Sequence, residues 1–192
     1  MEKLTGFKKT KTAVFISGTG SNLKNLIKFS KTKKSPISIN LIISNNSLAG
    51  GLKYADQFNI KKKIFNFQNF KNAEKNILML LKKEQIKFVC LAGFMKILSK
   101  SFIKKNDGKI INIHPSLLPK YKGLNTHSRV IKNKDKFAGC TVHYVTEKLD
   151  SGKIILQKKF KVTSKDSVVS LAKKVLKLEH KLYSAAIMKV FN

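Results

Sequence analysis

The chain has 192 residues, 42% of them hydrophobic, so it is long enough for one sizeable core or at most two small ones. Its 40 Lys and Arg residues against 10 Asp and Glu residues give a formal net charge of +30. No apolar run approaches the roughly 20 residues of a membrane-spanning helix, and the charged start MEKLTGFKKTKT lacks the apolar core of a signal peptide. The two isolated cysteines, Cys90 and Cys140, form neither a disulfide framework nor a zinc site. We therefore expect a cytoplasmic protein without a membrane segment or a metal.

Short β-branched runs alternate with helix-like segments along the chain. Strands are predicted, in chain order, at residues 12–17, 36–44, 62–66, 88–92, 109–114, 138–146 and 153–160. Helices are predicted at residues 22–30, 49–59, 69–84 and 167–190. The β–α alternation implies a parallel, doubly wound sheet, and the turn EKLDSG joins the last two strands into a hairpin. We therefore predict a Rossmann-like α/β fold, with a mostly parallel twisted sheet, helices on both faces and a mixed C-terminal part.

The first candidate site is the sequence GTGSNL at residues 18–23, between a predicted strand and a predicted helix. Glycines let the backbone approach an anion closely, and the N–H groups at a helix start attract phosphate. The third glycine of the dinucleotide-binding pattern is replaced by Leu23, and no GK[ST] of a P-loop follows. Two interpretations stay open: a site for a single phosphate, or a plain turn with Ser21 or Asn22 as the helix N-cap.

The second candidate site lies in the sequence INIHPSLLPKYKGLNTH at residues 111–127. Asn112 and His114 end a β-branched strand, and side chains two residues apart in a strand share one face. In open α/β sheets, ligands bind at the carboxyl ends of the strands. An amide and an imidazole at this place can polarise a carbonyl group and stabilise the oxyanion formed when it is attacked. The alternative is a structural His114 that holds the proline-framed loop.

The third candidate residue is Asp150, at the tip of the turn between the last two predicted strands. A turn aspartate usually caps its own backbone. A carboxylate next to His114 would instead orient the imidazole and stabilise its protonated form. The other histidines are weaker candidates, because His127 lies in a loop, His143 inside a strand and His180 on the last helix.

The chain resembles the phosphoribosylglycinamide formyltransferases, folate-dependent enzymes of purine biosynthesis, in the segments VFISGTGSNLKNLI, LAGFMKILS, INIHPSLLPKYKGLNTH and GCTVHYVTEKLDSGKIILQ. The resemblance runs from about Thr12 to the last helix. It implies one formyltransferase domain over residues 1–192, with a nucleotide-binding half at about 1–108 and a folate-binding and catalytic half at about 109–192. The implied activity is formyl transfer from the cosubstrate 10-formyltetrahydrofolate to the amine of glycinamide ribonucleotide, without a metal, by a monomer or homodimer.

The resemblance also implies roles for individual residues. The catalytic trio is Asn112, His114 and Asp150. The ribonucleotide is bound through its phosphate and its ribose hydroxyls by Gly20, Ser21, Asn22 and Glu179. The folate is bound by Asn112 and by two segments, Met95, Lys96, Ile97 and Leu98, and then Thr146, Glu147, Lys148, Leu149 and Asp150. The chain departs from the family at Thr19, where Asn is common, and near the start of the third helix. There family members often carry an Arg for the folate or its tail, and Lys71 is the only nearby cation that could take this folate-binding place.

Two other enzymes share the Asn-His-Asp core. Methionyl-tRNA formyltransferase continues with an Arg-Gly-Ala-like loop and a second β-barrel domain, and formyltetrahydrofolate deformylase carries an extra N-terminal domain. The loop PKYKGLNTH and the 192-residue length favour neither of them.

A basic nucleic-acid-binding module is the alternative of another class, since a net charge of +30 suits a polyanionic partner. Against it, Arg129 is the only arginine among the 40 basic residues, whereas nucleic-acid surfaces use arginine heavily. The lysines are also spread along the whole chain instead of gathering in one arm. We therefore expect small-molecule partners, with no membrane and no nucleic acid among them.

Overall fold

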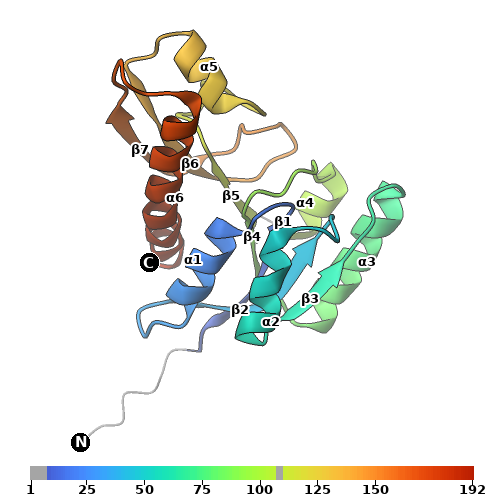
Figure 1. The fold of residues 1–192 in the computed structure, drawn as a ribbon. Coiled ribbons are helices and arrows are strands. Elements are labelled where there is room, and N and C mark those ends of the chain that lie inside the picture. The colour runs from blue at the N-terminus through green and yellow to red at the C-terminus, as the bar shows by residue number, and fades with distance from the viewer. Residues whose placement is uncertain (1–7, 107–109) are drawn as a thin grey trace, which may run out of the picture.

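The computed structural model describes residues 8–106 and 110–192, and it is built around one seven-stranded sheet in the order β3-β2-β1-β4-β5-β6-β7 (Figure 1). The strands are, in chain order, β1 (Thr10–Ile16), β2 (Ile37–Ser44), β3 (Lys61–Ile64), β4 (Phe88–Leu91), β5 (Ile110–His114), β6 (Phe137–Tyr144) and β7 (Ile154–Lys161). Strands β1 to β5 pair in parallel, whereas β6 pairs antiparallel with both β5 and β7. The predicted parallel sheet with a mixed C-terminal part is confirmed.

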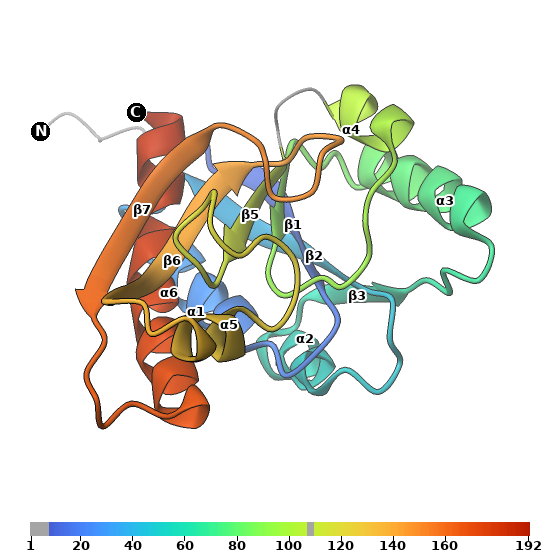
Figure 2. The same ribbon diagram turned by 90° about the horizontal axis from the view of Figure 1, so that it is seen from above.

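Helices cover both faces of the sheet, as predicted (Figures 1 and 2). They are α1 (Ser21–Ser30), α2 (Lys53–Phe58), α3 (Phe70–Lys83), α4 (Lys100–Asn106), α5 (Thr126–Lys132) and α6 (Val168–Phe191). Helices α1 and α6 share one apolar core with the sheet, and α3 and α4 share the core on the other face. None of the helices in the described part of the chain is long and apolar enough to cross a membrane.

Successive side chains of β1 point alternately into the two apolar cores on either face of the sheet. Val14 and Ile16 point into the core with α1 and α6, and Ala13 and Phe15 point into the core with α3 and α4. All four side chains are fully buried, because a strand with helices on both sides has no solvent face. The carboxyl ends of β1, β4 and β5 therefore open at one edge of a rigid central sheet.

Several predicted elements need correction. The predicted helix at residues 49–59 begins with a 3-10 turn (Gly50–Leu52), and α2 ends at Phe58. Helices α4 and α5 were not predicted, because α4 buries only Phe102 and α5 only Thr126 and Val130, too few side chains for a periodic apolar pattern. Lys109, the predicted start of the fifth strand, lies outside the described residues.

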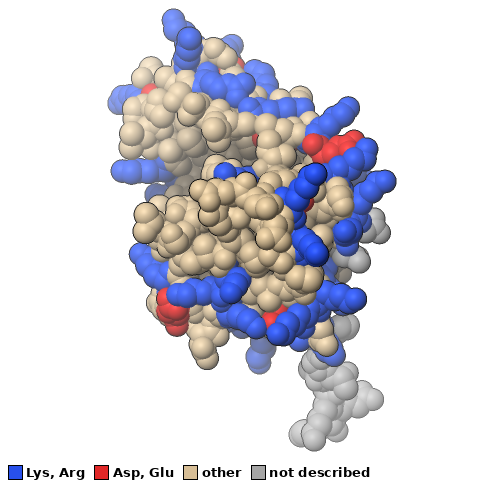
Figure 3. All heavy atoms as spheres, turned by 90° about the vertical axis from the view of Figure 1, so that its right-hand side faces the viewer, with Lys and Arg blue, Asp and Glu red and all other residues tan. Residues whose placement is uncertain are grey.

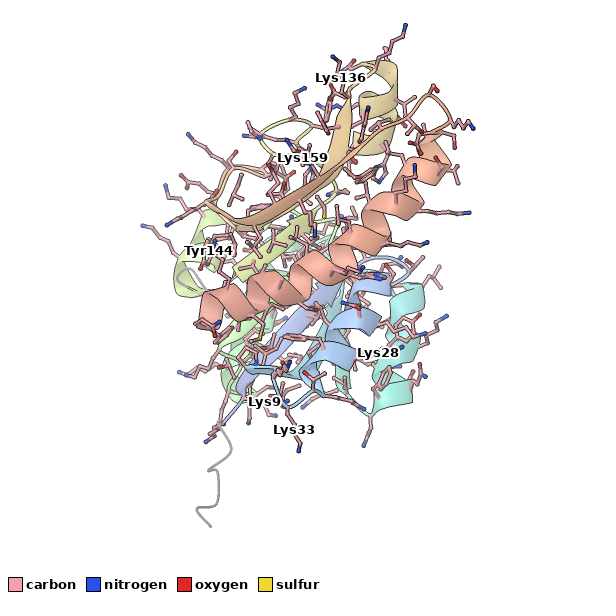
Figure 4. The ribbon with its side chains drawn as sticks, turned by 90° about the vertical axis from the view of Figure 1, so that its left-hand side faces the viewer. Lys9, Lys28, Lys33, Lys136, Tyr144 and Lys159 are labelled. Atoms are coloured by element: carbon pink, nitrogen blue, oxygen red, sulfur yellow. The ribbon has the colours of Figure 1, made fainter. Side chains whose placement is uncertain are left out.

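Lysines are spread over the surface of the molecule. Figure 3 shows Lys and Arg side chains from the top to the bottom of one face. On the opposite side, Lys28 and Lys33 lie toward one end of the molecule, and Lys136 and Lys159 toward the other (Figure 4). Both edge strands carry exposed lysines, at residues 61–63 on β3 and at residues 158, 159 and 161 on β7. Charged side chains on edge strands oppose pairing with another sheet, so part of the charge has a structural explanation.

We expect Tyr183→Phe to lower the free energy of unfolding by roughly 1–2 kcal/mol. The Tyr183 side chain is fully buried, and its hydroxyl donates to the carbonyl oxygen of Leu91 at 2.9 Å and lies 3.3 Å from that of Ile111. The bond ties α6 to the strand ends beside Asn112. Urea unfolding measures the change.

Tyr144→Phe is the matched control, because the Tyr144 side chain is only partly buried and its hydroxyl makes no hydrogen bond within the part of the chain that the structure describes. This variant should stay within about 0.5 kcal/mol of the wild type. Equal stability of the two variants would contradict the role given to Tyr183.

Candidate active site

Strand β5 carries Asn112 and His114 to the carboxyl end of the sheet. The sequence IINIH forms a strand because its β-branched residues are buried on the sheet, and its alternation places Asn112 and His114 on one face. His114 is only 5% exposed, and Asn112 is half-buried. Two polar side chains therefore stand at the edge where parallel strands end.

Asp150 reaches these side chains from the turn between β6 and β7. Its Oδ2 lies 3.3 Å from His114 Nδ1 and accepts the backbone N–H of Gly123 at 2.8 Å. The carboxylate is 7% exposed, and the Asp150 backbone adopts a left-handed φ of +45°. This unfavourable backbone angle is held by contacts around it. The structure thus brings Asn112, His114 and Asp150 together.

A fourth side chain, His143, lies in the same cluster. The register of β5 and β6 places it directly opposite Asn112. Its Nδ1 lies 2.9 Å from the Tyr144 carbonyl oxygen, and its Nε2 lies 3.3 Å from Asn112 Nδ2. His143 Nε2 also lies 3.6 Å from Asp150 Oδ1.

From sequence, His143 is a weak candidate, because a histidine inside a strand is usually structural. The antiparallel register between β5 and β6 is the signal that identifies it, and this register follows from the pairing of two strands that are distant in the chain.

His114 is held on both sides of its ring. Its Nε2 lies 2.8 Å from the backbone carbonyl oxygen of Tyr121, so Nε2 carries a proton, and its Nδ1 faces Asp150. Both neighbours are acceptors, and only the imidazolium form can donate to both. The two readings of His114 are therefore compatible, since the ring holds the loop that follows β5 and also faces the carboxylate.

For both His114 and Asp150, burial and the neighbouring polar groups shift the pKa in opposite directions. Burial lowers the pKa of His114, and the hydrogen bond to Tyr121 and the charge of Asp150 offset only part of this effect. Burial raises the pKa of Asp150, but His143, the Gly123 amide and the charge of His114 together hold that pKa below its ordinary value. Asp150 is therefore a carboxylate at neutral pH.

The loop between β1 and α1 forms the second part of the site. Gly20 is the N-cap of α1 with a φ of +75°, and no side chain of the described residues caps this helix end, so the prediction of Ser21 or Asn22 as N-cap is wrong. A Cβ atom at Gly20 would lie 2.5 Å from the Cα of Gly51, so glycine is required here. A cavity of about 230 Å³ is lined by residues 17–22, 92, 93 and 95. The N-terminus of α1 opens beside this cavity and favours an anion.

Glu179 on α6 reaches this loop through Asn22. Asn22 Nδ2 donates to Glu179 Oε2 at 2.8 Å, and the two side chains are 9% and 6% exposed. Burial raises the pKa of Glu179 to about 7, against the effect of the Asn22 hydrogen bond. Asn22 Oδ1 is buried without a hydrogen-bond partner among the described residues. The structure therefore places an acidic side chain and a free acceptor next to the predicted phosphate loop.

The predicted folate segment at residues 95–98 is fixed at both ends. The N–H of Met95 donates to Ser17 Oγ at 2.7 Å. Glu74 accepts the N–H of Ser99 at 2.7 Å and also the Ser99 hydroxyl. Between these anchors, the side chains of Met95 and Ile97 are 62% and 63% exposed. Exposed apolar side chains on an anchored backbone are typical of a ligand-binding surface.

The second predicted folate segment, at residues 146–150, is exposed except for the side chain of Asp150. An ion pair of 2.9 Å between Lys100 and Glu147 joins it to the start of α4, directly after the first segment. Figure 3 shows the surface hollowed between its upper part, which carries α5, and its lower part, which carries α2.

Lys71 is not joined to these segments. It lies exposed in the first turn of α3, without a hydrogen bond or ion pair to the described residues. A larger cavity, of about 350 Å³, lies beside the start of α3; four asparagines of α3 and of the loop before it line it, and none of the trio does. The Asn69 side chain caps the N-terminus of α3, whereas no side chain of the described residues caps α1, so the smaller cavity is the better candidate for an anion. Among the described residues, no group of His, Cys, Asp or Glu side chains is arranged to hold a metal ion.

The comparisons with known proteins agree on one family. The Formyl transferase family matches residues 10–187. The trifunctional purine biosynthetic protein adenosine-3 of Homo sapiens is 42% identical over 186 residues, and the match spans 95% of this chain but only 18% of that protein. The phosphoribosylglycinamide formyltransferase of Haemophilus influenzae is 40% identical over 180 residues, 92% of this chain and 85% of that protein. A crystal structure of phosphoribosylglycinamide formyltransferase from Brucella melitensis matches with a TM-score of 0.91 at 40% identity, over 95% of this chain and 96% of that one.

We expect Glu179→Gln to stabilise the protein in a pH-dependent way. The folded-state pKa of about 7 lies above the ordinary value of 4.5, so the folded protein binds more protons than the unfolded chain between these pH values. The free energy of unfolding of the wild type therefore falls as pH rises through this window, and the variant lacks this fall. Urea unfolding at several pH values should show a difference near zero at low pH that grows to about 3 kcal/mol above pH 7. A difference that is independent of pH would contradict the raised pKa.

Proposed function

This chain belongs to the formyl transferase family, and we propose that it transfers the formyl group of 10-formyltetrahydrofolate to the amine of glycinamide ribonucleotide. The products are formylglycinamide ribonucleotide and tetrahydrofolate. The convergence of an amide, two imidazoles and a carboxylate at the end of β5 carries the proposal. The choice of substrate is supported by relatives that are named phosphoribosylglycinamide formyltransferase, because this chain matches most of their length.

The substrates take two neighbouring places in this proposal. The phosphate of the ribonucleotide lies against Gly20, Ser21 and Asn22, and Glu179 accepts from the ribose hydroxyls. The folate lies against residues 95–98 and 146–150. The cavity at the phosphate loop is lined by Met95 as well as by residues 17–22, so the two places share a wall. The N-terminal half then supplies most of the nucleotide site and the C-terminal half the catalytic groups.

The amine of the ribonucleotide attacks the formyl carbon, and the carbonyl oxygen takes up the negative charge. Asn112 donates an amide N–H to this oxyanion, and the imidazolium of His114 donates a second hydrogen bond. One such donor lowers the barrier by about 3 kcal/mol. Of the two contacts of His114, the one to Asp150 at 3.3 Å is longer than the one to Tyr121 at 2.8 Å, so Nδ1–H is the group that turns toward the oxyanion.

Proton transfer completes the reaction. As the new C–N bond forms, the amine loses a proton, which Asp150 accepts through a water molecule. The proton passes to N10 of the folate, the bond between N10 and the formyl carbon breaks, and the carbonyl group reforms. Asp150 starts as a carboxylate, because its pKa is held below the ordinary value. No covalent intermediate with the protein is required.

The net charge of +30 fits this function without a nucleic acid. Both substrates are anions, and a positive field raises their rate of encounter with the site at low salt. The spread of lysines around the surface in Figures 3 and 4 gives such a field without forming one nucleic-acid groove.

A direct assay separates the proposal from its alternatives. The protein is mixed with 10-formyltetrahydrofolate and glycinamide ribonucleotide, and the release of tetrahydrofolate is followed. We expect release that depends on the ribonucleotide. Release without it would indicate a deformylase, and no release with active folate would leave a binding protein, with a steep salt dependence of RNA or DNA binding as its signature.

We expect Asp150→Asn to lower kcat by roughly 100- to 10,000-fold, because the variant cannot accept the amine proton. The affinity for the ribonucleotide should stay within about threefold of the wild type, since Asp150 is not part of the phosphate loop. Asp56→Asn is the matched control, because Asp56 is an exposed residue of α2 that pairs with Lys62 far from the trio. Survival of more than a tenth of the activity in Asp150→Asn would contradict the role of Asp150.

A further inference from the structure

Arg129 is the one guanidinium group of the chain, among 40 basic residues, and formyl transfer as proposed above assigns it no role. It lies on α5, which follows the loop after β5. The loop contains Tyr121, whose carbonyl oxygen is bonded to His114. We therefore ask why arginine, and not lysine, stands beside this loop.

Arg129 binds the loop in two ways at once. One terminal nitrogen donates to the carbonyl oxygen of Lys122 at 2.7 Å and lies 3.5 Å from that of Leu124. The guanidinium carbon Cζ lies over the Tyr121 ring, 4.9 Å from its centre. A planar cation can stack on an aromatic ring and donate hydrogen bonds at its edge at the same time.

Tyr121 itself is held in an unusual conformation. Its backbone has a left-handed φ of +56°, which is unfavourable for an aromatic residue. Its hydroxyl donates to Asp135 at 2.7 Å and accepts from Asn133 at 2.8 Å. The ring is thus clamped at its tip by hydrogen bonds and on its face by Arg129, and this clamp fixes where the Tyr121 carbonyl points.

We propose that Arg129 is a positioning residue for His114, because it holds the Tyr121 carbonyl against Nε2 and so reserves Nδ1 for Asp150 and the oxyanion. The inference rests on the proposed function in one respect, the participation of His114 in formyl transfer. If the Tyr121 carbonyl moved away, the neutral ring could carry its proton on either nitrogen, and the ring could turn. The contact requires a cation that lies over the Tyr121 ring and also donates hydrogen bonds from its edge to the loop carbonyl groups. This requirement explains why position 129 is an arginine.

Lysine cannot replace arginine in this contact. Its ammonium group is a compact charge that can bind one carbonyl group but has no plane to cover the ring. Arg129→Lys therefore keeps the positive charge near His114 and removes the stacking, which separates positioning from electrostatics. The charged and titratable groups that face His114 are Asp150, His143, His127 and Arg129 itself, and all keep their charge in this variant.

The experiment compares the wild type with Arg129→Lys by steady-state kinetics and by NMR of ¹⁵N-labelled histidine. We expect a fall in kcat of about tenfold with KM for the ribonucleotide unchanged, since a displaced catalytic group lowers the rate of the chemical step. We also expect a lower pKa for His114, because the Tyr121 carbonyl raises it. At a pH high enough for the ring to be neutral, we expect a mixture of tautomers in place of the Nε2–H form.

Lys132→Arg is the matched control, because it makes the reverse exchange at an exposed position on the same helix. It should leave the rate and the NMR signals of His114 unchanged. Arg129 is exposed, so its replacement should not unfold the protein. Unchanged His114 signals in Arg129→Lys, with or without a loss of thermal stability, would overturn the proposal. A wild type without formyl transfer would overturn the proposed function instead, and the NMR comparison would still test the contact.

Discussion

A buried carboxylate between two imidazoles holds the candidate active site together. Asp150 contacts His114 of β5 and His143 of β6, and it also accepts the backbone N–H of Gly123 in the loop after β5. One side chain from a turn thus connects two strands and a loop. Burying a charge is unfavourable unless it is paired and hydrogen-bonded, and these partners make the arrangement possible. The same partners keep Asp150 ionised, which is the state that the proposed mechanism requires.

The parallel sheet brings the two proposed substrate sites to one edge. The carboxyl end of β1 leads into the phosphate loop, and that of β4 leads into residues 95–98. Ser17 joins them, because its N–H donates to the Gly93 carbonyl at 3.0 Å and its hydroxyl accepts the N–H of Met95. Glu74 fixes the far end of the segment. The reactants can therefore be held in a defined relative position, which accounts for a large share of catalysis in a transfer between two bound molecules.

Much of this arrangement could be predicted from the sequence, where it depends on short-range patterns. The β-branched run that ends at His114, the glycines of the phosphate loop and the hairpin around Asp150 each have a local signal. Three features depend on distant parts of the chain. The place of His143 follows from the register between β5 and β6. The contact of Asn22 with Glu179 follows from the packing of α1 on α6. The direction of the Tyr121 carbonyl follows from the contacts of its side chain with Arg129 and Asp135. At the N-cap of α1, Gly20 is required by its close approach to Gly51 and not by capping, so the alternative with Ser21 or Asn22 at this position does not hold.

The most direct test is a crystal structure of the protein with glycinamide ribonucleotide and a folate analogue that cannot transfer its formyl group. The account predicts the formyl oxygen within hydrogen-bond distance of Asn112 Nδ2 and the His114 ring, the ribonucleotide amine facing the formyl carbon, and Asp150 within reach of that amine directly or through one water. A formyl group bound away from these side chains, with the three groups facing no ligand, would contradict it.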